Sequence, residues 1–328
     1  MVAIEQIRNE LAQASPSGRQ LVAVFVGGTS GIGESTAREL VRYSTSPRIY
    51  LIGRSQDQAD RIKTEFASLN PASDVCFVQS DASQLRNVDN LCDKIKAQEE
   101  RLDVLFLSAG IFHLRGREET PDGLDRKMAL DFYSRLRFTE NLLPLLRRAS
   151  SLSSSQSTRE LLPAGGRVIS VLGGGKETSI DESDLSLTRK YTLKASTDNA
   201  VTMTTLSFQR LAAEPENANV AFFHTSPGMV KTNGDRELNF VIRLLVSTVS
   251  YVFRPWVTST EETGKRHLWA AVSDSFRGGQ VYLLDRTSER AENSKVLNRL
   301  HEEGLSDRVW EHTREVFSRI PTGDNHNV

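Results

Sequence analysis

The chain has 328 residues, 38% of them hydrophobic and 25% charged, with a formal net charge of -1. This balance is typical of a globular protein with a full core, and it gives no reason to expect nucleic acid as a partner. The two cysteines, Cys76 and Cys92, form no CxxC pair and are expected as buried thiols, so no metal site is predicted. No apolar run is long enough to indicate a signal peptide or a spanning segment, and the cytoplasm is the expected compartment.

Strand and helix patterns alternate along most of the chain. Residues 1–20 predict a short amphipathic helix appended to a single domain over residues 21–285, and residues 286–328 predict a helical extension. The predicted strands are Leu21–Gly27, Arg48–Gly53, Val75–Ser80, Leu102–Ser108, Arg167–Leu172, Val220–Thr225 and Gln280–Leu284. The predicted helices are Ile32–Ser44, Gln56–Leu69, Gln84–Glu99, Gly123–Ala149, Tyr191–Glu214 and Thr260–Ser273.

The strands read as near-continuous apolar runs, which is typical of a parallel sheet covered on both faces. Repeated strand–helix units with right-handed crossovers predict an α/β fold with a doubly wound, Rossmann-type sheet. Ligands on such a sheet bind beyond the carboxyl ends of the strands, so the site is expected there.

The first strand runs into a glycine-rich turn and then into a helix. The turn residues are Gly27, Thr29, Ser30, Gly31, Ile32 and Gly33. Backbone N–H groups and a helix N-terminus meet at such a turn, and both favour a phosphate. Its glycines allow tight turning and close approach of a pyrophosphate, so we predict dinucleotide binding.

Two insertions interrupt the alternation. Ser150–Thr158 is serine-rich and is expected as a surface loop without a chemical role. Residues 229–262 hold the apolar side chains Phe240, Leu244, Tyr251, Phe253 and Trp256. Three interpretations stay open: a helix packed on the core, a hydrophobic lid over a bulky apolar substrate, or a membrane-surface contact.

Several motifs in order resemble the short-chain dehydrogenase/reductase family. Val26–Gly33 is similar to its TGxxxGIG turn, Leu107–Gly110 to its NNAG strand end, and Ser226–Thr232 to its PGxVxT loop at the nicotinamide. The resemblance adds these cofactor-binding residues: Asp81 and Ala82 near the adenine, Ser108, Ala109 and Gly110 at the NNAG position, and Pro227, Gly228, Val230 and Thr232 at the nicotinamide. The tail, including Val309–Thr313, resembles larger fungal members that act on secondary metabolites.

The end of the second strand indicates which nicotinamide cofactor binds. A carboxylate there accepts from the ribose hydroxyls of NAD, but this chain has Arg54 and Ser55. A guanidinium pairs with the 2′-phosphate that distinguishes NADP, so NADP(H) is the predicted cofactor.

The catalytic positions of the family match this chain unevenly. Gly173 stands where the family has its serine, and Asp131 where it has an asparagine. Tyr191 resembles the catalytic tyrosine, but Lys194 follows three residues later where the family's lysine follows four later. Counting without gaps places Thr192 and Ser196 at these two positions.

Two functions from different classes follow, together with an inactive binding protein as a third. The first is an NADPH-dependent reductase with Tyr191 as proton donor and Lys194 as the residue that tunes its pKa. A backbone N–H of Gly173 or Gly174, a side chain from the lid, or water would take the place of the serine. The second is a non-redox cyclase or isomerase in which Asp131 is the acid or base and NADP is structural. Alternatively, Asp131 pairs with Arg135, and Tyr191 and Lys194 point into solvent.

The resemblance also bears on the partners. The family often pairs through its fourth and fifth helices, so a homodimer is an expectation, although the arginines of the Gly123–Ala149 pattern weigh against it. His113 is expected as a loop residue at the mouth of the cleft.

Overall fold

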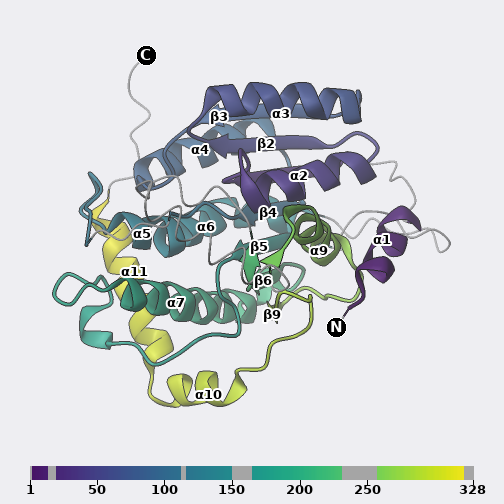
Figure 1. Cartoon of the computed structure of the whole chain (residues 1–328). Helices are drawn as coiled ribbons and strands as arrows, with labels where there is room; N and C mark the ends of the chain where they lie inside the picture. Colours follow the sequence, from purple (N-terminus) through teal and green to yellow (C-terminus); the bar gives the residue numbers. More distant parts are fainter. Residues whose placement is uncertain (1, 14–19, 112–115, 150–164, 231–256, 321–328) are drawn as a thin grey trace.

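The computed structural model describes residues 2–13, 20–111, 116–149, 165–230 and 257–320. Its centre is a seven-stranded sheet in which every pairing is parallel (Figure 1). The strand order is β3 (Asp74–Gln79), β2 (Arg48–Gly53), β1 (Val22–Val26), β4 (Val104–Leu107), β5 (Arg167–Val171), β6 (Ala221–Thr225) and β9 (Gln280–Leu284). The order reverses between β1 and β4, so the predicted doubly wound sheet is confirmed.

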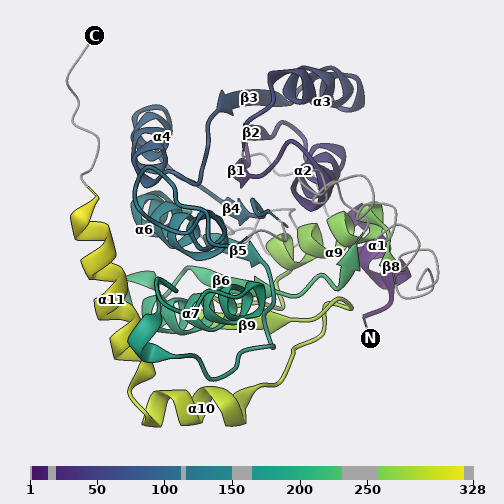
Figure 2. The ribbon, with the colours of Figure 1, turned by 60° about the vertical axis from the view of Figure 1, so that its left-hand side comes forward.

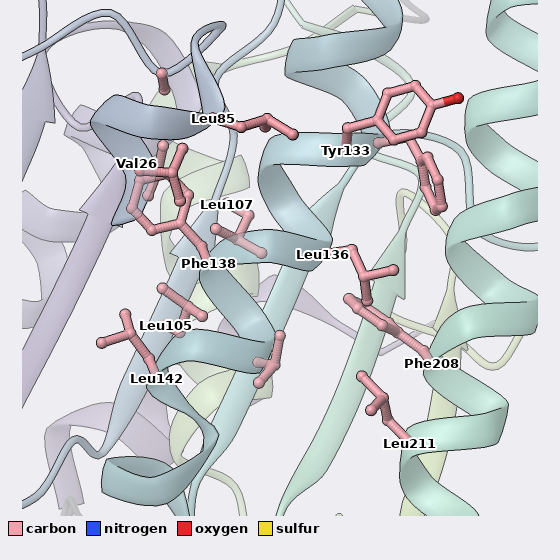
Figure 3. Packing of buried hydrophobic residues seen from close by; sticks show 14 of the residues in the cluster. Val26, Leu85, Leu105, Leu107, Tyr133, Leu136, Phe138, Leu142, Phe208 and Leu211 are labelled. Atoms are coloured by element: carbon pink, nitrogen blue, oxygen red, sulfur yellow. The ribbon is translucent and has the colours of Figure 1, made fainter. Parts of the chain in front are cut away.

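Helices cover both faces of the sheet. One face carries α1 (Ile4–Gln13), α2 (Gly31–Tyr43), α3 (Gln56–Leu69) and α9 (Thr260–Val272). The other carries α4 (Leu85–Gln98), α6 (Ser134–Arg147) and α7 (Leu193–Ala213). Side chains of β1 alternate between the two cores, with Val24 in one and Phe25 in the other. Figure 3 shows Phe138 and Leu142 of α6 near Leu105 and Leu107 of β4.

The helix expected over Gly123–Ala149 is interrupted. A short α5 (Arg126–Met128) leads into a π-helical turn at Ala129–Tyr133, and α6 follows. A π-helical turn widens the helix by one residue, and such turns are frequent at functional sites. Short 3-10 helices lie at Glu182–Asp184 and Pro215–Asn217.

The C-terminal extension packs on the outer face of α6 and α7. It consists of α10 (Ser294–Glu302) and α11 (Leu305–Arg319), and Figure 2 shows α11 beside both helices. Arg137 of α6 lies over the Phe317 ring, 4.9 Å from its centroid, and Arg314 pairs with Glu140. This contact brings a segment distant in sequence against the helix that contains the π-helical turn.

The insertion after β6 begins and ends at a small parallel pair, β7 (Met229–Val230) with β8 (Val257–Thr258). The predicted lid aromatics, Thr232, His113 and the serine-rich run lie outside the described residues. Among the helices that the structure describes, none has the length and apolar character needed to cross a bilayer.

Candidate functional site

A cavity of about 700 Å³ lies at the carboxyl edge of the sheet, across the point where the strand order reverses. Its walls come from the ends of strands β1 to β6. The predicted cofactor-binding residues that line it are Gly27, Thr29, Ser30, Gly31, Ile32, Arg54, Ser55, Asp81, Ala82, Ser108, Ala109, Gly110 and Pro227. Gly33, Gly228 and Val230 do not line it. The carboxyl edge of the sheet, where the sequence predicts the site, therefore holds a cavity of the size that a ligand site requires.

The glycine turn is packed too closely to admit side chains at two positions. Gly27 has a φ of +87°, and a Cβ there would lie 2.6 Å from the backbone N of Ala109. A Cβ at Gly33 would lie 2.5 Å from the carbonyl oxygen of Gly27. The turn is therefore held directly against the end of β4, and the first turn of α2 faces the cavity through Gly31 and Ile32. Such a helix start offers unpaired N–H groups to an anion.

The far end of the cavity is formed by the residues after β2 and β3. The Ser55 hydroxyl accepts from the backbone N–H of Gln58 and caps α3, which leaves its own hydrogen for a ligand. One oxygen of Asp81 accepts from the backbone N–H of Ser83 at 2.9 Å and from its hydroxyl at 2.7 Å. Arg54 is exposed on the cavity wall.

The opposite end holds a buried charged cluster on the interrupted helix. Asp131 is 2% exposed and lines the cavity, as predicted, but it pairs with Lys127 as well as with Arg135. Lys127, which also lines the cavity, was missed by sequence reasoning. The available signal was its position four residues before Asp131 on one helical pattern, a spacing that places the two side chains side by side.

Arg135 holds this end of the site together. Its guanidinium is buried and donates to the carbonyl oxygens of Leu130, Val171 and Ala109 and to the Ser170 hydroxyl, at 2.8 to 3.0 Å. These acceptors belong to the π-helical turn and to the ends of β4 and β5. The same guanidinium lies 3.8 Å from a carboxylate oxygen of Asp131. The Asp131–Arg135 ion pair that the sequence suggested as an alternative is therefore present.

Tyr191 and Lys194 are not brought together. Tyr191 lies before α7, whose N-cap is Thr192, so the spacing expected within a helix does not apply to it. The Lys194 side chain is 82% exposed and pairs with Asp198 at 2.5 Å. The assignment of Lys194 as the tuner of Tyr191 therefore has no support in this geometry, because the ammonium is turned into solvent.

The Tyr191 hydroxyl is buried and has no hydrogen-bond partner among the described residues. Burial raises its pKa, the negative charges of Asp125, Asp131 and Glu118 raise it further, and the neighbouring Ser196 hydroxyl opposes them. Tyr191 is accordingly a neutral phenol near the charged cluster. It does not line the cavity.

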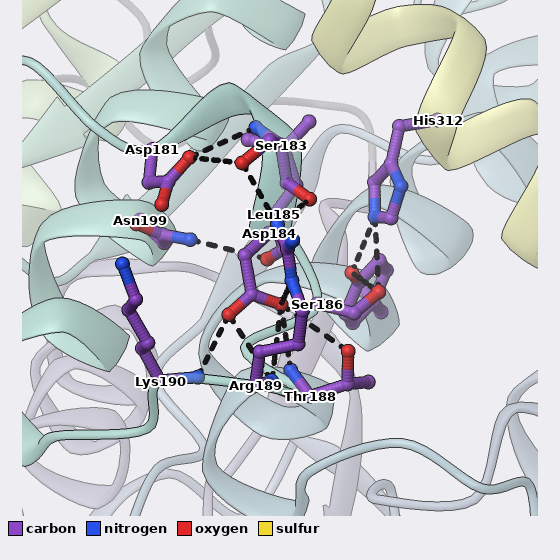
Figure 4. A network of polar contacts seen from close by, with 11 residues as sticks. Asp181, Ser183, Asp184, Leu185, Ser186, Thr188, Arg189, Lys190, Asn199 and His312 are labelled. Carbon is purple, nitrogen blue, oxygen red and sulfur yellow. Dashed lines mark hydrogen bonds and ion pairs between the residues drawn. The ribbon is translucent and has the colours of Figure 1, made fainter.

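The loop that leads to Tyr191 is organised by Asp184. Its carboxylate accepts from the backbone N–H groups of Thr188, Arg189 and Lys190, as Figure 4 shows. Nearby, Nε2 of His312 from α11 lies 2.8 Å from the Tyr133 hydroxyl at the end of the π-helical turn. The first network fixes the backbone just before Tyr191, and the second joins α11 to the π-helical turn.

A side chain at Gly173, where the resemblance expects the family's serine, would be crowded. A Cβ there would lie 2.7 Å from Cγ2 of Val201. Its N–H donates to Nε2 of His224 at 3.3 Å, so this N–H is already paired within the protein and gives no support to a substrate-binding role. Nδ1 of His224 is hydrogen-bonded to the Thr205 hydroxyl, which donates to Glu177, and Glu177 also accepts from Asn293. This chain of hydrogen bonds was not predicted from the sequence.

Two fully buried histidines predict acid sensitivity. Burial lowers the pKa of His224 to about 3 and that of His267 to about 4, against 6.5 for exposed histidine. Below pH 6.5 both histidines become protonated in the unfolded chain but stay neutral in the native protein. The free energy of unfolding therefore decreases as the pH falls below 6.5. We expect the free energy of unfolding to drop below pH 6.5 by up to about 1.4 kcal/mol per pH unit per histidine, with half of that slope at pH 6.5 and nearly the full slope by about pH 5.5.

Urea unfolding at several pH values tests this expectation. His267→Gln should reduce the slope by about one proton. An unfolding free energy that is flat across this window would contradict the account.

The sequence pattern of the short chain dehydrogenase family matches residues 21–153. Oxidoreductase AN1596 of Emericella nidulans is 35% identical over 94% of this chain and 97% of the relative. Short-chain dehydrogenase/reductase SAT2 of Stachybotrys chartarum is 26% identical over 98% of each chain. Among solved structures, the Pseudomonas aeruginosa RhlG/NADP active-site complex is 21% identical and shares the fold, with a TM-score of 0.59 over 84% of this chain and 97% of that chain. The chain therefore belongs to the short-chain dehydrogenase/reductase family of oxidoreductases.

Proposed function

We propose that this protein is an NADPH-dependent reductase that transfers a hydride to a carbonyl group of a bulky apolar substrate, for which a secondary metabolite is the expected class. The observation that carries the proposal is the cavity at the strand-order reversal, with the glycine turn in its wall and a buried charged cluster at one end. Ile111, Leu130 and Leu172 also line the cavity, and their apolar side chains favour an apolar substrate.

The chain's own residues fit the cofactor along the length of the cavity. The turn from Gly27 to Gly33 offers N–H groups to a pyrophosphate, and Asp81 lies where an adenine is expected. The loop of Pro227, Gly228, Val230 and Thr232 is proposed to hold the nicotinamide. Bound NADPH supplies the hydride, and the carbonyl oxygen needs a proton as the hydride arrives. That proton comes from the end of the cavity that holds Asp131, near which Tyr191 lies.

The choice of NADP over NAD rests on Arg54 and Ser55. RhlG was solved with NADP, which agrees with this choice. We expect Arg54→Asp to weaken NADPH binding by about 100-fold, because a carboxylate repels the 2′-phosphate that the guanidinium attracts. Fluorescence titration with NADPH and NADH measures both affinities. Lys94→Asp is the control, because Lys94 is an exposed cation of α4 that does not line the cavity. Unchanged NADPH affinity in Arg54→Asp would show that the assignment of NADP is wrong.

The proposed function is tested by NADPH consumption. Purified protein is mixed with NADPH and with menthone or camphor as bulky apolar ketones, or with acetone as a small one. Alcohol formation in step with NADPH oxidation, with menthone and camphor preferred, supports the reductase. Conversion of a substrate without any NADPH oxidation, undiminished when NADP⁺ replaces NADPH, would instead support the non-redox enzyme. The observation that favours this second candidate is a buried Asp131 with no serine at Gly173.

Two predictions about the protein's surroundings stay predictions. A homodimer through the outer face of α6 and α7 would have to displace α11, which lies on that face, so another face is needed for self-pairing. A location in the cytoplasm remains the expectation.

A further inference from the structure

Lys127 is a nearly buried cation with unused hydrogen-bonding capacity. The residue is 5% exposed and lines the cavity, and Asp131 is its partner within the described residues. An ammonium has three donor hydrogens, and Asp131 takes up one of them, so two have no acceptor among the described residues. Buried polar hydrogens without an acceptor are costly, and this points to an oxygen of a ligand as the missing partner.

The neighbouring cation cannot take this role. Arg135 directs its donors to the carbonyl oxygens of Leu130, Val171 and Ala109 and to the Ser170 hydroxyl, and is thereby committed to holding the backbone. Lys127 donates to no backbone carbonyl in the part of the chain that the structure describes. Of the two cations beside Asp131, Lys127 alone therefore has donors to offer to a substrate.

We propose that Lys127 contacts the carbonyl oxygen of the substrate and gives it the proton, in place of the family's tyrosine and lysine; this rests on the proposed reductase function. Bound NADPH would supply the hydride to the carbonyl carbon, and the two electrons of the C=O π bond would move to the oxygen. The oxygen takes a proton from Nζ of Lys127, which becomes a neutral amine and is reprotonated from water. The sum is ketone, NADPH and a proton giving alcohol and NADP⁺.

Asp131 is the positioning residue for this group. It holds the ammonium across one helical turn, and the π-helical turn at Ala129–Tyr133 contains it. Gly110 leaves the space that the carboxylate needs, because a Cβ there would lie 3.0 Å from Oδ1 of Asp131. The residue that the family resemblance placed at an asparagine position thus acts through Lys127.

Tyr191 is less suited to the role. It lies outside the cavity wall, and the charged groups that face it, Asp125, Asp131 and Glu118, are all negative. No ammonium among the described residues of α7 stabilises its phenolate, since Lys194 pairs with Asp198. Of these two candidate proton donors, the one that lines the cavity is therefore Lys127 on the interrupted helix, and not Tyr191 before α7.

The test measures single-turnover reduction of menthone by enzyme saturated with NADPH. Lys127→Met should slow the hydride step by about 100-fold or more, with NADPH affinity changed by less than about threefold. Lys127→Met leaves the buried Asp131 carboxylate without one of its two cations, which can destabilise the protein. The double variant Lys127→Met/Asp131→Leu removes both charges and replaces the single variant in the test if that variant does not fold. Lys265→Met is the matched control, because Lys265 is a buried lysine of α9 that does not line the cavity. It pairs with Glu261 four residues away and lies 3.9 Å from the buried Glu39 of α2.

Chemical rescue separates proton transfer from structure. In Lys127→Ala, added ethylamine should restore the rate in proportion to its concentration, which a structural role would not produce. Three results would overturn the inference: full activity of Lys127→Met, loss of NADPH binding in that variant, or loss of the hydride step in Tyr191→Phe but not in Lys127→Met. A wild-type protein that binds NADPH and reduces no ketone would refute the reductase itself, which is a different failure.

Discussion

Replacing Gly27 with valine is expected to weaken NADPH binding by about 100-fold, which corresponds to about 2.8 kcal/mol. The φ of +87° at this position disfavours any β-branched residue, and its Cβ would lie 2.6 Å from the Ala109 backbone N. The turn would have to move away from β4, and its N–H groups would lose their common direction. Fluorescence titration with NADPH measures the change.

Gly123→Ala is the matched control for this substitution. Gly123 also has a positive φ, +75°, but nothing lies within 4 Å of its Cβ position among the described residues and it does not line the cavity. It should cost about 1 kcal/mol of stability through backbone strain and leave NADPH affinity unchanged. Binding of NADPH by Gly27→Val with wild-type affinity would mean that the turn does not hold the cofactor.

Replacing Arg135 with methionine is expected to lower the free energy of unfolding by about 3 kcal/mol. The buried guanidinium joins the ends of β4 and β5 to the π-helical turn through four acceptors. In Arg135→Met, the buried carbonyl oxygens of Val171 and Ala109 lose the hydrogen bonds that the guanidinium donates to them, which lowers stability. Asp131 also loses one of the two cations that pair with it. Urea unfolding without cofactor measures the loss.

Two further variants sharpen this test. Arg135→Lys should recover little stability, since one ammonium cannot reach acceptors that a planar fork spans. Arg319→Met removes an exposed arginine that pairs with Glu315 on α11, and it should stay within about 0.5 kcal/mol of the wild type. An Arg135→Met protein as stable as the wild type would show that the guanidinium does not organise this end of the site.

The sheet and its ligand edge could be predicted because both depend on short-range patterns. Arg48–Gly53 and Gln280–Leu284 have the bounds that their apolar runs indicate. The cavity then follows from where parallel strands end, so residues as far apart in the chain as Gly27, Asp81 and Pro227 can be assigned to one site from the sequence pattern.

The catalytic end could not be predicted in the same way. The Gly123–Ala149 pattern shows no sign of the π-helical turn, because the same side chains suit a regular helix. Tyr191 lies one residue before the N-cap of α7, and a single residue decides whether Lys194 faces it or solvent. The chain of Glu177, Thr205, His224 and Asn293 joins segments that only tertiary packing brings together.

Isothermal titration calorimetry with NADPH and NADH tests the central claim most directly, namely that the cavity at the glycine turn holds a nicotinamide dinucleotide. We expect one NADPH bound per chain, weaker binding of NADH, and a rise in thermal stability that grows with NADPH concentration. Neither heat nor thermal protection from either nucleotide would contradict the account.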